Sequence, residues 1–281
     1  MNKGYIKIAL ALLSVACYMQ NIVFASECAP KTKSSNKEPK QQLYIDHKEA
    51  KQAANVMAEA LSVAKKLAIH TNDYKLYSKK DEGEALYFKR VNNTDIAKLD
   101  LTIPNPNNYD SIISMLMDPS APKNFYNAHV EGAISRIYDP NLVIIKQHYK
   151  NNSGPCQRYC HLLAKKTELS KDETAIVFVS PDVNDHDSKN NKNYINPILR
   201  RVNSFKPDIN SQGSIRNRNA LKMYINLAAF FIKREADCVK VTFIGSIDLN
   251  LSPKAKEHAV KKVTASIILD IAKLRDIFKK E

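Results

Sequence analysis

The chain has 281 residues, 44% of them hydrophobic, which is enough to bury the core of one domain or of a small pair of domains. Its formal net charge of +14 favours anionic partners, either a nucleic acid or an acidic membrane surface, and disfavours cationic ones. No segment repeats at a period of about 20–50 residues, which argues against a solenoid.

The N-terminal residues predict a secretory signal peptide. Two lysines precede an apolar run from Ile8 to Ala16, and Ala25 is a small residue at a suitable cleavage point. The alternative is a membrane anchor. Gln20 and Asn21 interrupt the apolar segment before it reaches the roughly 20 residues that a spanning helix needs. We therefore expect secretion and a soluble mature chain.

The remainder divides into a tether and one folded region. Residues 26–42 are rich in Lys, Ser and Pro and have little to bury, so we expect a disordered basic tether after the signal peptide of residues 1–25. Residues 43–281 carry the periodic apolar patterns of secondary structure. We expect them to form a single domain.

Four cysteines remain after Cys17 leaves with the signal peptide: Cys28, Cys156, Cys160 and Cys238. Four thiols in a secretory protein can form disulfides, but the sequence does not determine their pairing. The stretch "CQRYCH" places two of them beside His161, without the companion ligands of a zinc site. We expect semi-buried thiols on a strand and no metal.

The first half of the domain predicts a helix, three strands and a short helix. Asp46 is a suitable N-cap, and apolar residues at helical spacing follow it up to Leu67. Alternation of apolar and polar residues predicts strands at 74–81, 84–93 and 96–104. The segment 107–119 then reads as a short amphipathic helix that ends at a proline.

The second half predicts a further group of strands and one long helix. The strands are expected at 130–139, 141–150, 157–166, 174–180, 223–235 and 238–249. A hydrophilic insertion separates the fourth from the fifth, with a further strand possible at 198–205. Runs of antiparallel strands with helices at both ends indicate an α+β fold, not alternating βαβ units.

The last helix is expected to run from Pro253 to Lys279, with Ser252 as its N-cap. Its apolar residues recur every three or four positions and form one stripe. The stripe consists of Val260, Val263, Ile267, Ile271, Leu274 and Phe278. Such a stripe needs an apolar surface to cover.

Several longer strings resemble a known family. "TFIGSIDLN" before the final helix, and "RYCHLLAKKTELSKDETAIVFVS", resemble the last strand and the strand–Ω-loop–strand unit of START (StAR-related lipid transfer) domains. "EGAISRIYDPNL", "KMYINLAAFFIKREADCVKVTF" and the opening "MNKGYIKIALALLSVA" resemble the fam-a multigene family of malaria parasites. The resemblance extends over nearly the whole mature chain.

The resemblance implies a helix-grip fold, in which a curved antiparallel sheet wraps the long C-terminal helix and encloses a lipid tunnel. It also implies a secreted, monomeric carrier of one phospholipid, most of all phosphatidylcholine, that contacts membrane surfaces transiently. The expected destination is the parasitophorous vacuole or the host cell. No cofactor is implied, and none of the common motifs of hydrolases, metalloproteases or P-loop enzymes occurs.

Candidate lipid-binding residues follow from the resemblance and from the strand patterns. The candidates for the headgroup are Lys123, Arg136, Arg158, Tyr159 and His161. The candidates for the apolar lining are Ile176, Phe178, Leu227, Val241 and Phe243 on strands, and Val263, Ile267 and Ile271 on the final helix. START proteins selective for phosphatidylcholine carry a choline-caging aromatic residue where this chain has Cys160.

Two other functions stay open. The chain is alternatively a host-facing interaction or antigenic module that keeps the fold without lipid transfer. Nucleic-acid binding would use the positive charge, but the chain lacks basic motifs interleaved with aromatic residues, and secretion speaks against it. The acidic stretch "DVNDHD" lacks the glycine and terminal glutamate of an EF-hand, so we expect no calcium site.

Overall fold

The computed structural model of the protein describes residues 46–70, 72–80, 83–150, 157–186, 193–209, 220–251 and 255–279. All of them fall in one unit of the chain, Gln41–Glu281. The expected signal peptide (1–25), the tether (26–42), Cys28 and Cys156 lie outside the described residues. Cys160 and Cys238 are buried free thiols. In the described part of the chain, no helix combines the length and apolar character needed to cross a membrane.

The described strands form one ten-stranded sheet with the order β1-β2-β3-β10-β9-β7-β6-β5-β4, and β8 pairs with β6. The strands are β1 (Lys75–Lys80), β2 (Glu84–Val91), β3 (Thr94–Pro104), β4 (His129–Asp139), β5 (Leu142–Lys150), β6 (Gln157–Ser170), β7 (Glu173–Val179), β8 (Ala220–Lys222), β9 (Tyr224–Arg234) and β10 (Cys238–Asp248). Neighbours along the order are antiparallel, and the β6–β8 pair is parallel. The α+β prediction is confirmed.

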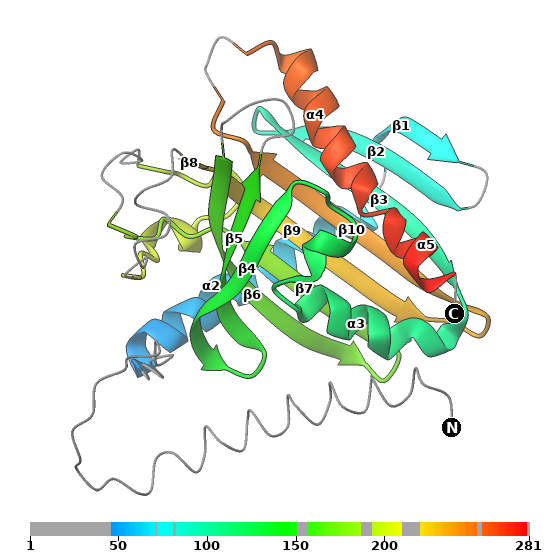
Figure 1. Ribbon diagram of the computed structural model, residues 1–281, viewed down its shortest axis with the longest axis horizontal. Helices are drawn as coiled ribbons and strands as arrows, with labels where there is room; N and C mark the ends of the chain where they lie inside the picture. Colours follow the sequence, from blue (N-terminus) through cyan, green and yellow to red (C-terminus); the bar gives the residue numbers. More distant parts are fainter. Residues whose placement is uncertain are drawn as a thin grey trace, which may run out of the picture. The chain divides into compact units, whose positions relative to one another are not determined.

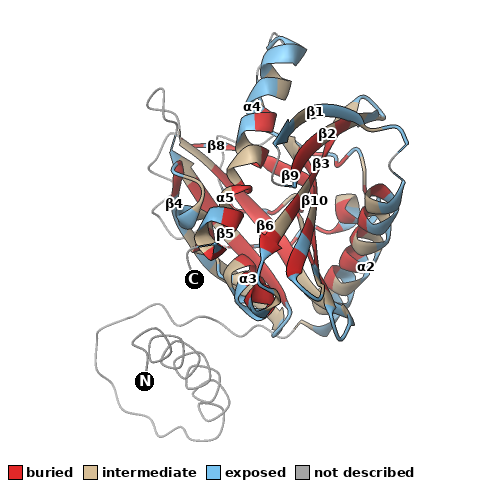
Figure 2. Ribbon diagram, turned by 90° about the vertical axis from the view of Figure 1, so that its right-hand side faces the viewer, coloured by how far each residue is buried: buried red, intermediate tan, exposed pale blue. Residues whose placement is uncertain are grey.

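Helices cover both faces of the sheet (Figures 1 and 2). We call the face covered by α2 (His47–Ile69) the outer face. The inner face carries α3 (Tyr109–Met117), α4 (Glu257–Asp270) and α5 (Lys273–Phe278). Three short 3-10 helices complete the described elements: η1 (Pro106–Asn108), η2 (Ala121–Asn124) and η4 (Arg201–Ser204).

Helix α2 forms where the sequence predicts it. The Asp46 carboxylate accepts hydrogen bonds from the backbone N–H groups of Lys48 (2.8 Å) and Glu49 (3.2 Å), which caps the helix N-terminus. The buried positions recur every three or four residues from Ala53 to Leu67. The small alanines of this stripe let the helix lie close to the outer face of the sheet.

Strand β7 shows how the two faces receive different side chains. Ala175, Val177 and Val179 pack on the outer face beneath α2. Ile176 and Phe178 pack with residues of the inner face. The alternation follows from the period of two along a strand, so the face of each residue depends on the register of its strand.

The prediction of an Ω-loop between β6 and β7 is wrong. Strand β6 continues to Ser170, which pairs with Glu173 across a turn at residues 171 and 172. Residues 167–170 alternate half-buried and exposed side chains and continue the ladder with β7, because a polar strand end at the surface needs no buried face. The two strands therefore form a continuous hairpin.

The prediction of a possible strand at residues 198–205 is also wrong. Its apolar residues Leu199, Val202 and Phe205 are three apart, which suits a helical turn, and all are buried in the core under α2. The Asn196 side chain starts this turn by accepting hydrogen bonds from the N–H groups of Ile198 and Leu199, each at 2.9 Å. The segment ends in the 3-10 helix η4.

The C-terminal helix is divided in two, contrary to the prediction of one continuous helix. It begins at Glu257, so the predicted start at Pro253 is wrong; Ser252 and Pro253 themselves lie outside the described residues. At residues 271 and 272 the backbone N–H groups bond three residues back, to the carbonyls of Ile268 (3.0 Å) and Leu269 (3.1 Å). This tighter turn separates α4 from α5.

Candidate functional site

A cavity of about 620 Å³ lies on the inner face of the sheet. Strands β5, β6, β7, β9 and β10 contribute its floor, and α4 contributes its roof. The segment from the end of α3 through η2 to Ala128 contributes a side wall. The volume falls within the roughly 300–1,000 Å³ of small-molecule sites. The interior of this domain is therefore hollow at one end.

The other end of the inner face is solid. There α5 packs against β3, α3 packs against β7 and β9, and their side chains form one buried cluster with residues of β10. Ile176, Val241 and Phe243 belong to this filled cluster, together with Ile268 and Leu274 of the C-terminal helices. The sheet thus has one packed end and one open end on the same face.

Most of the cavity lining is apolar. Leu162, Phe178 and Phe230 contribute from the floor, and Val263 and Ile267 contribute from α4. Such a lining offers no hydrogen-bonding partners along most of its length. A ligand that fits here needs a long apolar part.

Among the described residues a single arginine, Arg158, lines the cavity. It donates a hydrogen bond from Nη1 to the backbone carbonyl of Leu249, which leaves other guanidinium donors for a ligand. The other arginines that are buried or half-buried in the described chain, Arg136, Arg234 and Arg275, each pair with a carboxylate. Within the same residues Arg158 has no carboxylate within ion-pair distance. Its environment suits an anionic ligand group.

Two tyrosines and two aspartates line the cavity as well: Tyr126, Tyr149, Asp118 and Asp270. The rings of Tyr126 and Tyr149 are 5.6 Å apart between centroids. Burial raises the pKa of the Tyr126 hydroxyl, the Asp270 carboxylate raises it further, and the Arg158 guanidinium lowers it. Both charged groups therefore act on the same end of the cavity, where two aromatic faces lie.

A glycine allows the side wall to approach the sheet. A Cβ atom on Gly132 of β4 would lie 1.9 Å from the carbonyl oxygen of Pro119, which no packing tolerates. The same carbonyl accepts a hydrogen bond of 2.8 Å from Gln147 Nε2. Gln147 Oε1 in turn lies 2.6 Å from His129 Nε2. These contacts fix the wall that carries Tyr126.

Five of the predicted binding residues meet at the cavity: Arg158, Phe178, Val263, Ile267 and Ile271. They come from β6, β7 and the C-terminal helix region, which are distant in sequence. Their positions as lining residues agree with the prediction, and ligand binding by them stays a prediction.

Tyr159 and His161 lie on the outer face, one residue out of phase with the cavity-lining Arg158 and Leu162. Tyr159 donates a hydrogen bond of 3.1 Å to Asp185 Oδ2, and Lys222 Nζ lies 3.1 Å from the same oxygen. The predicted placement of these two residues beside a headgroup is therefore corrected: they hold a buried polar cluster beneath the insertion.

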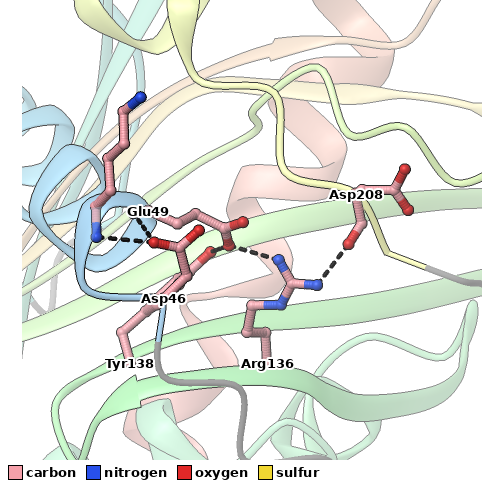
Figure 3. A network of polar contacts seen from close by, with 6 residues as sticks. Asp46, Glu49, Arg136, Tyr138 and Asp208 are labelled. Atoms are coloured by element: carbon pink, nitrogen blue, oxygen red, sulfur yellow. Dashed lines mark hydrogen bonds and ion pairs between the residues drawn. The ribbon is translucent and has the colours of Figure 1, made fainter.

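Arg136 and Tyr138 of β4 also serve the outer face. Both donate hydrogen bonds to Oε1 of Glu49 in α2, and Arg136 donates a second bond to the Asp208 carbonyl (Figure 3). This network ties the start of α2 to the sheet and to the insertion. Arg136 is thus a structural residue and does not line the cavity.

The remaining predicted residues also lie away from the lining. Leu227 packs on the outer face with Ala229, because it alternates along β9 with the cavity-lining Ala228 and Phe230. Lys123 in η2 is exposed and its neighbours Ala121 and Pro122 form the wall instead. Ile176, Val241 and Phe243 face the right side of the sheet but lie in its solid end.

The comparisons with known proteins identify the fold. No family model and no curated protein sequence matches the chain. Human StAR-related lipid transfer protein 5 superposes with a TM-score of 0.56 at 9% identity over 81% of this chain and 98% of its own. The lipid transfer and protein localization domain of human StarD13 gives 0.52 at 13% identity, covering 78% and 95%.

Human STARD10 gives a TM-score of 0.50 at 11% identity, covering 85% of this chain and 84% of its own. Identities this low establish the fold alone. The curved antiparallel sheet with its C-terminal helices is the START helix-grip fold, as the sequence predicts.

Proposed function

We propose that the protein is a non-enzymatic lipid carrier that holds one phospholipid, phosphatidylcholine, in the cavity and moves it between membranes. The START fold supports lipid binding, because the similar solved structures are described as lipid transfer proteins. The observation that carries the proposal is the cavity itself: a long apolar lining with two tyrosine rings and an arginine that pairs with no carboxylate of the described residues.

The apolar lining accounts for the acyl chains. Each CH₂ group that moves from water into such an environment contributes about 0.8 kcal/mol, so a chain of ordinary length supplies most of the binding free energy. The floor and the roof both present aliphatic and aromatic side chains, among them Phe178, Phe230 and Ile267. A polar ligand would leave these surfaces unused.

The polar end accounts for the headgroup. The guanidinium of Arg158 matches a phosphate, which can accept two parallel N–H bonds from it. The rings of Tyr126 and Tyr149 offer negative π faces to a quaternary ammonium group. Phosphatidylcholine has both groups a few bonds apart. The aromatic function that Cys160 cannot supply thus comes from a neighbouring strand and from the side wall.

Access to the cavity is proposed to occur at a membrane surface. Leu251 and Val263 line the cavity, yet 37% and 48% of their surfaces are exposed, so its rim is apolar. Exposed lysines lie nearby in sequence, Lys150 on the lining and Lys256 and Lys262 on or beside α4. Lysines attract the anionic leaflet of a membrane while apolar side chains enter it.

The proposed compartment follows from the N-terminal sequence. The signal-peptide pattern of residues 1–25 and the resemblance to the fam-a family support secretion into the parasitophorous vacuole or the host cell. The carrier is proposed to act there as a monomer.

Lipid extraction tests the proposal directly. The purified protein is examined by native mass spectrometry before and after incubation with phosphatidylcholine vesicles, and its lipid is extracted and identified. We expect one phospholipid per chain and transfer of labelled phosphatidylcholine between donor and acceptor vesicles. A protein that stays empty and transfers nothing would refute the carrier and favour the alternative, a host-facing interaction or antigenic module.

A further inference from the structure

We infer that Asp270, the last residue of the roof helix α4, makes the cavity select headgroups that carry a positively charged nitrogen. The inference rests on the proposed function and assigns its headgroup selectivity to one side chain. Asp270 is half-buried and lines the cavity opposite the floor strand that carries Arg158.

The Asp270 carboxylate has room for a second cationic partner. Lys273 Nζ lies 2.7 Å from its Oδ1 and also donates a hydrogen bond of 3.1 Å to the Phe125 carbonyl. No other described residue pairs with this carboxylate. The ion pair with Lys273 is partly exposed to solvent, and such pairs contribute only about 0–1 kcal/mol, so a ligand cation can compete with Lys273 for the carboxylate.

Tyr126 locates the carboxylate relative to Arg158. The two groups shift the pKa of the Tyr126 hydroxyl in opposite directions, so the ring lies within the field of both charges. Arg158 and Asp270 are therefore the lining cation and anion that act on this ring, whereas the second lining aspartate, Asp118, is exposed and accepts hydrogen bonds from Ser120. A zwitterion whose phosphate lies toward Arg158 has its ammonium group on the side of Asp270.

Selectivity needs a negative group because the rest of the protein attracts anions. The chain carries a net charge of +14, and Arg158 alone would bind the phosphate of an anionic lipid at least as well as that of a zwitterionic one. A carboxylate in the same cavity repels the extra negative charge of such a lipid and attracts an ammonium group. Asp270 thus discriminates between lipid headgroups by their charge, and the tyrosine rings discriminate between them by the methylation of the nitrogen.

A competition experiment tests the inference. The wild-type chain and the variant Asp270→Asn are incubated with vesicles of equal parts dioleoyl phosphatidylcholine and dioleoyl phosphatidic acid, then re-isolated, and the extracted lipids are quantified by mass spectrometry. We expect the wild type to be enriched in phosphatidylcholine. The ratio of bound phosphatidylcholine to phosphatidic acid should fall about tenfold in D270N, the magnitude expected of one charge-assisted contact.

Two variants serve as controls. Asp276→Asn removes the same charge from the exposed surface of α5, outside the cavity lining, and should keep the wild-type ratio. Asp270→Glu keeps the charge at the cavity and should keep the preference for phosphatidylcholine. Thermal unfolding of each variant shows that it is folded, and D270E supplies the comparison if D270N is destabilised.

The outcomes separate the inference from the proposed function. A lipid-loaded wild type with an unchanged ratio in D270N overturns the inference and leaves the carrier intact. An equal fall in D276N also overturns it, because overall charge then explains the effect. A wild type that takes up no lipid overturns the proposed function, and the inference falls with it.

Discussion

Tyr149 of β5 and Arg158 of β6 are directly paired across the antiparallel ladder, and both side chains line the cavity. Paired residues on one face of a sheet have Cβ atoms about 4.5–5.5 Å apart. An aromatic face and a guanidinium are therefore held side by side by the backbone register alone. This pair is the part of the candidate headgroup site that the sheet itself fixes.

The first prediction is that Arg158 contributes to lipid affinity, whereas Arg136 contributes to stability. Arg158→Gln should lower the affinity for phosphatidylcholine by about 10- to 100-fold, because a charge-assisted hydrogen bond to phosphate contributes about 1.5–3 kcal/mol. Its melting temperature should change little, since Arg158 has no carboxylate partner in the described chain. Binding is measured by transfer of a fluorescent phosphatidylcholine from vesicles to protein.

Arg136→Gln is the matched control. It breaks the contacts of Arg136 with Glu49 and with the Asp208 carbonyl on the outer face, so it should lower the free energy of unfolding by about 1–3 kcal/mol. Lipid affinity should stay at the wild-type level. A variant pair with the opposite behaviour would place the phosphate site at Arg136 and contradict the cavity assignment.

The second prediction concerns the two tyrosines. Tyr126→Leu and Tyr149→Leu should each reduce the preference for phosphatidylcholine over phosphatidylethanolamine by about twofold to thirtyfold, because each removes a π face worth about 0.5–2 kcal/mol to a quaternary ammonium group. The preference is measured by competition between the two lipids in mixed vesicles. The corresponding Phe variants keep the ring and should keep the preference; an equal loss in the Phe and Leu variants would implicate the hydroxyl instead.

The sequence predicts the elements well, because local periodicity determines them. The stripe of α2, the alternation in β3 and β7, and Val263, Ile267 and Ile271 on the final helix all follow from spacing. Spacing also places Val241 and Phe243 on the inner face correctly. It cannot tell that α3 and α5 fill that end of the face, because this depends on packing between distant segments.

The headgroup residues depend on register, which a single sequence leaves open. A shift of one residue along β6 exchanges Arg158 with Tyr159 between the faces, and Tyr159 and His161 were expected on the wrong one. Tyr149 becomes a candidate only once the β5–β6 pairing is known. Tyr126 lies in an irregular segment with no periodic signal, so only the tertiary structure could find it.

The third prediction concerns the apolar rim. The chain contains no tryptophan, so Val263→Trp introduces a single fluorescent reporter at the mouth of the cavity. On addition of vesicles containing anionic lipid, its emission should shift to the blue as the indole leaves water. The shift should weaken at high salt, because salt screens the attraction between lysines and the membrane.

Ile69→Trp is the control for that experiment. Ile69 is 73% exposed, more than Val263, but it ends α2 on the opposite face of the sheet. Its emission should stay unchanged when vesicles are added. Equal shifts at both positions would mean unspecific adsorption of the protein, and no shift at Val263→Trp would remove the rim from the proposed mechanism.

The fourth prediction is a loss of stability in mild acid caused by His161. The ring is fully buried next to Asp185 (Nε2 to Oδ2, 3.6 Å) and neither nitrogen has a hydrogen-bond partner in the described chain. Burial lowers its pKa, and the Asp185 carboxylate offsets this only in part. The unfolded chain, with a histidine pKa of about 6.5, therefore binds a proton before the folded chain does.

The sign of the pH dependence follows from that difference. Below about pH 6.5 the unfolded state gains the proton of His161 while the folded state stays neutral, so the free energy of unfolding falls by up to about 1.4 kcal/mol per pH unit. His129, whose pKa burial also lowers, adds to the same trend. Urea unfolding of wild type and His161→Phe between pH 7.5 and 5.5 measures the contribution of His161.

His161→Phe should unfold with a shallower pH dependence, because phenylalanine can keep the edge-to-face contact with Tyr159 but cannot take up a proton. His47→Gln, at an exposed position in the first turn of α2, should keep the wild-type dependence. If H161F retained the wild-type slope, the ring would be protonated or solvated in the folded chain. Water would then reach the polar cluster beneath the insertion, which consists of Tyr159, His161, Asp185 and Lys222. That result would contradict its assignment as a buried structural cluster.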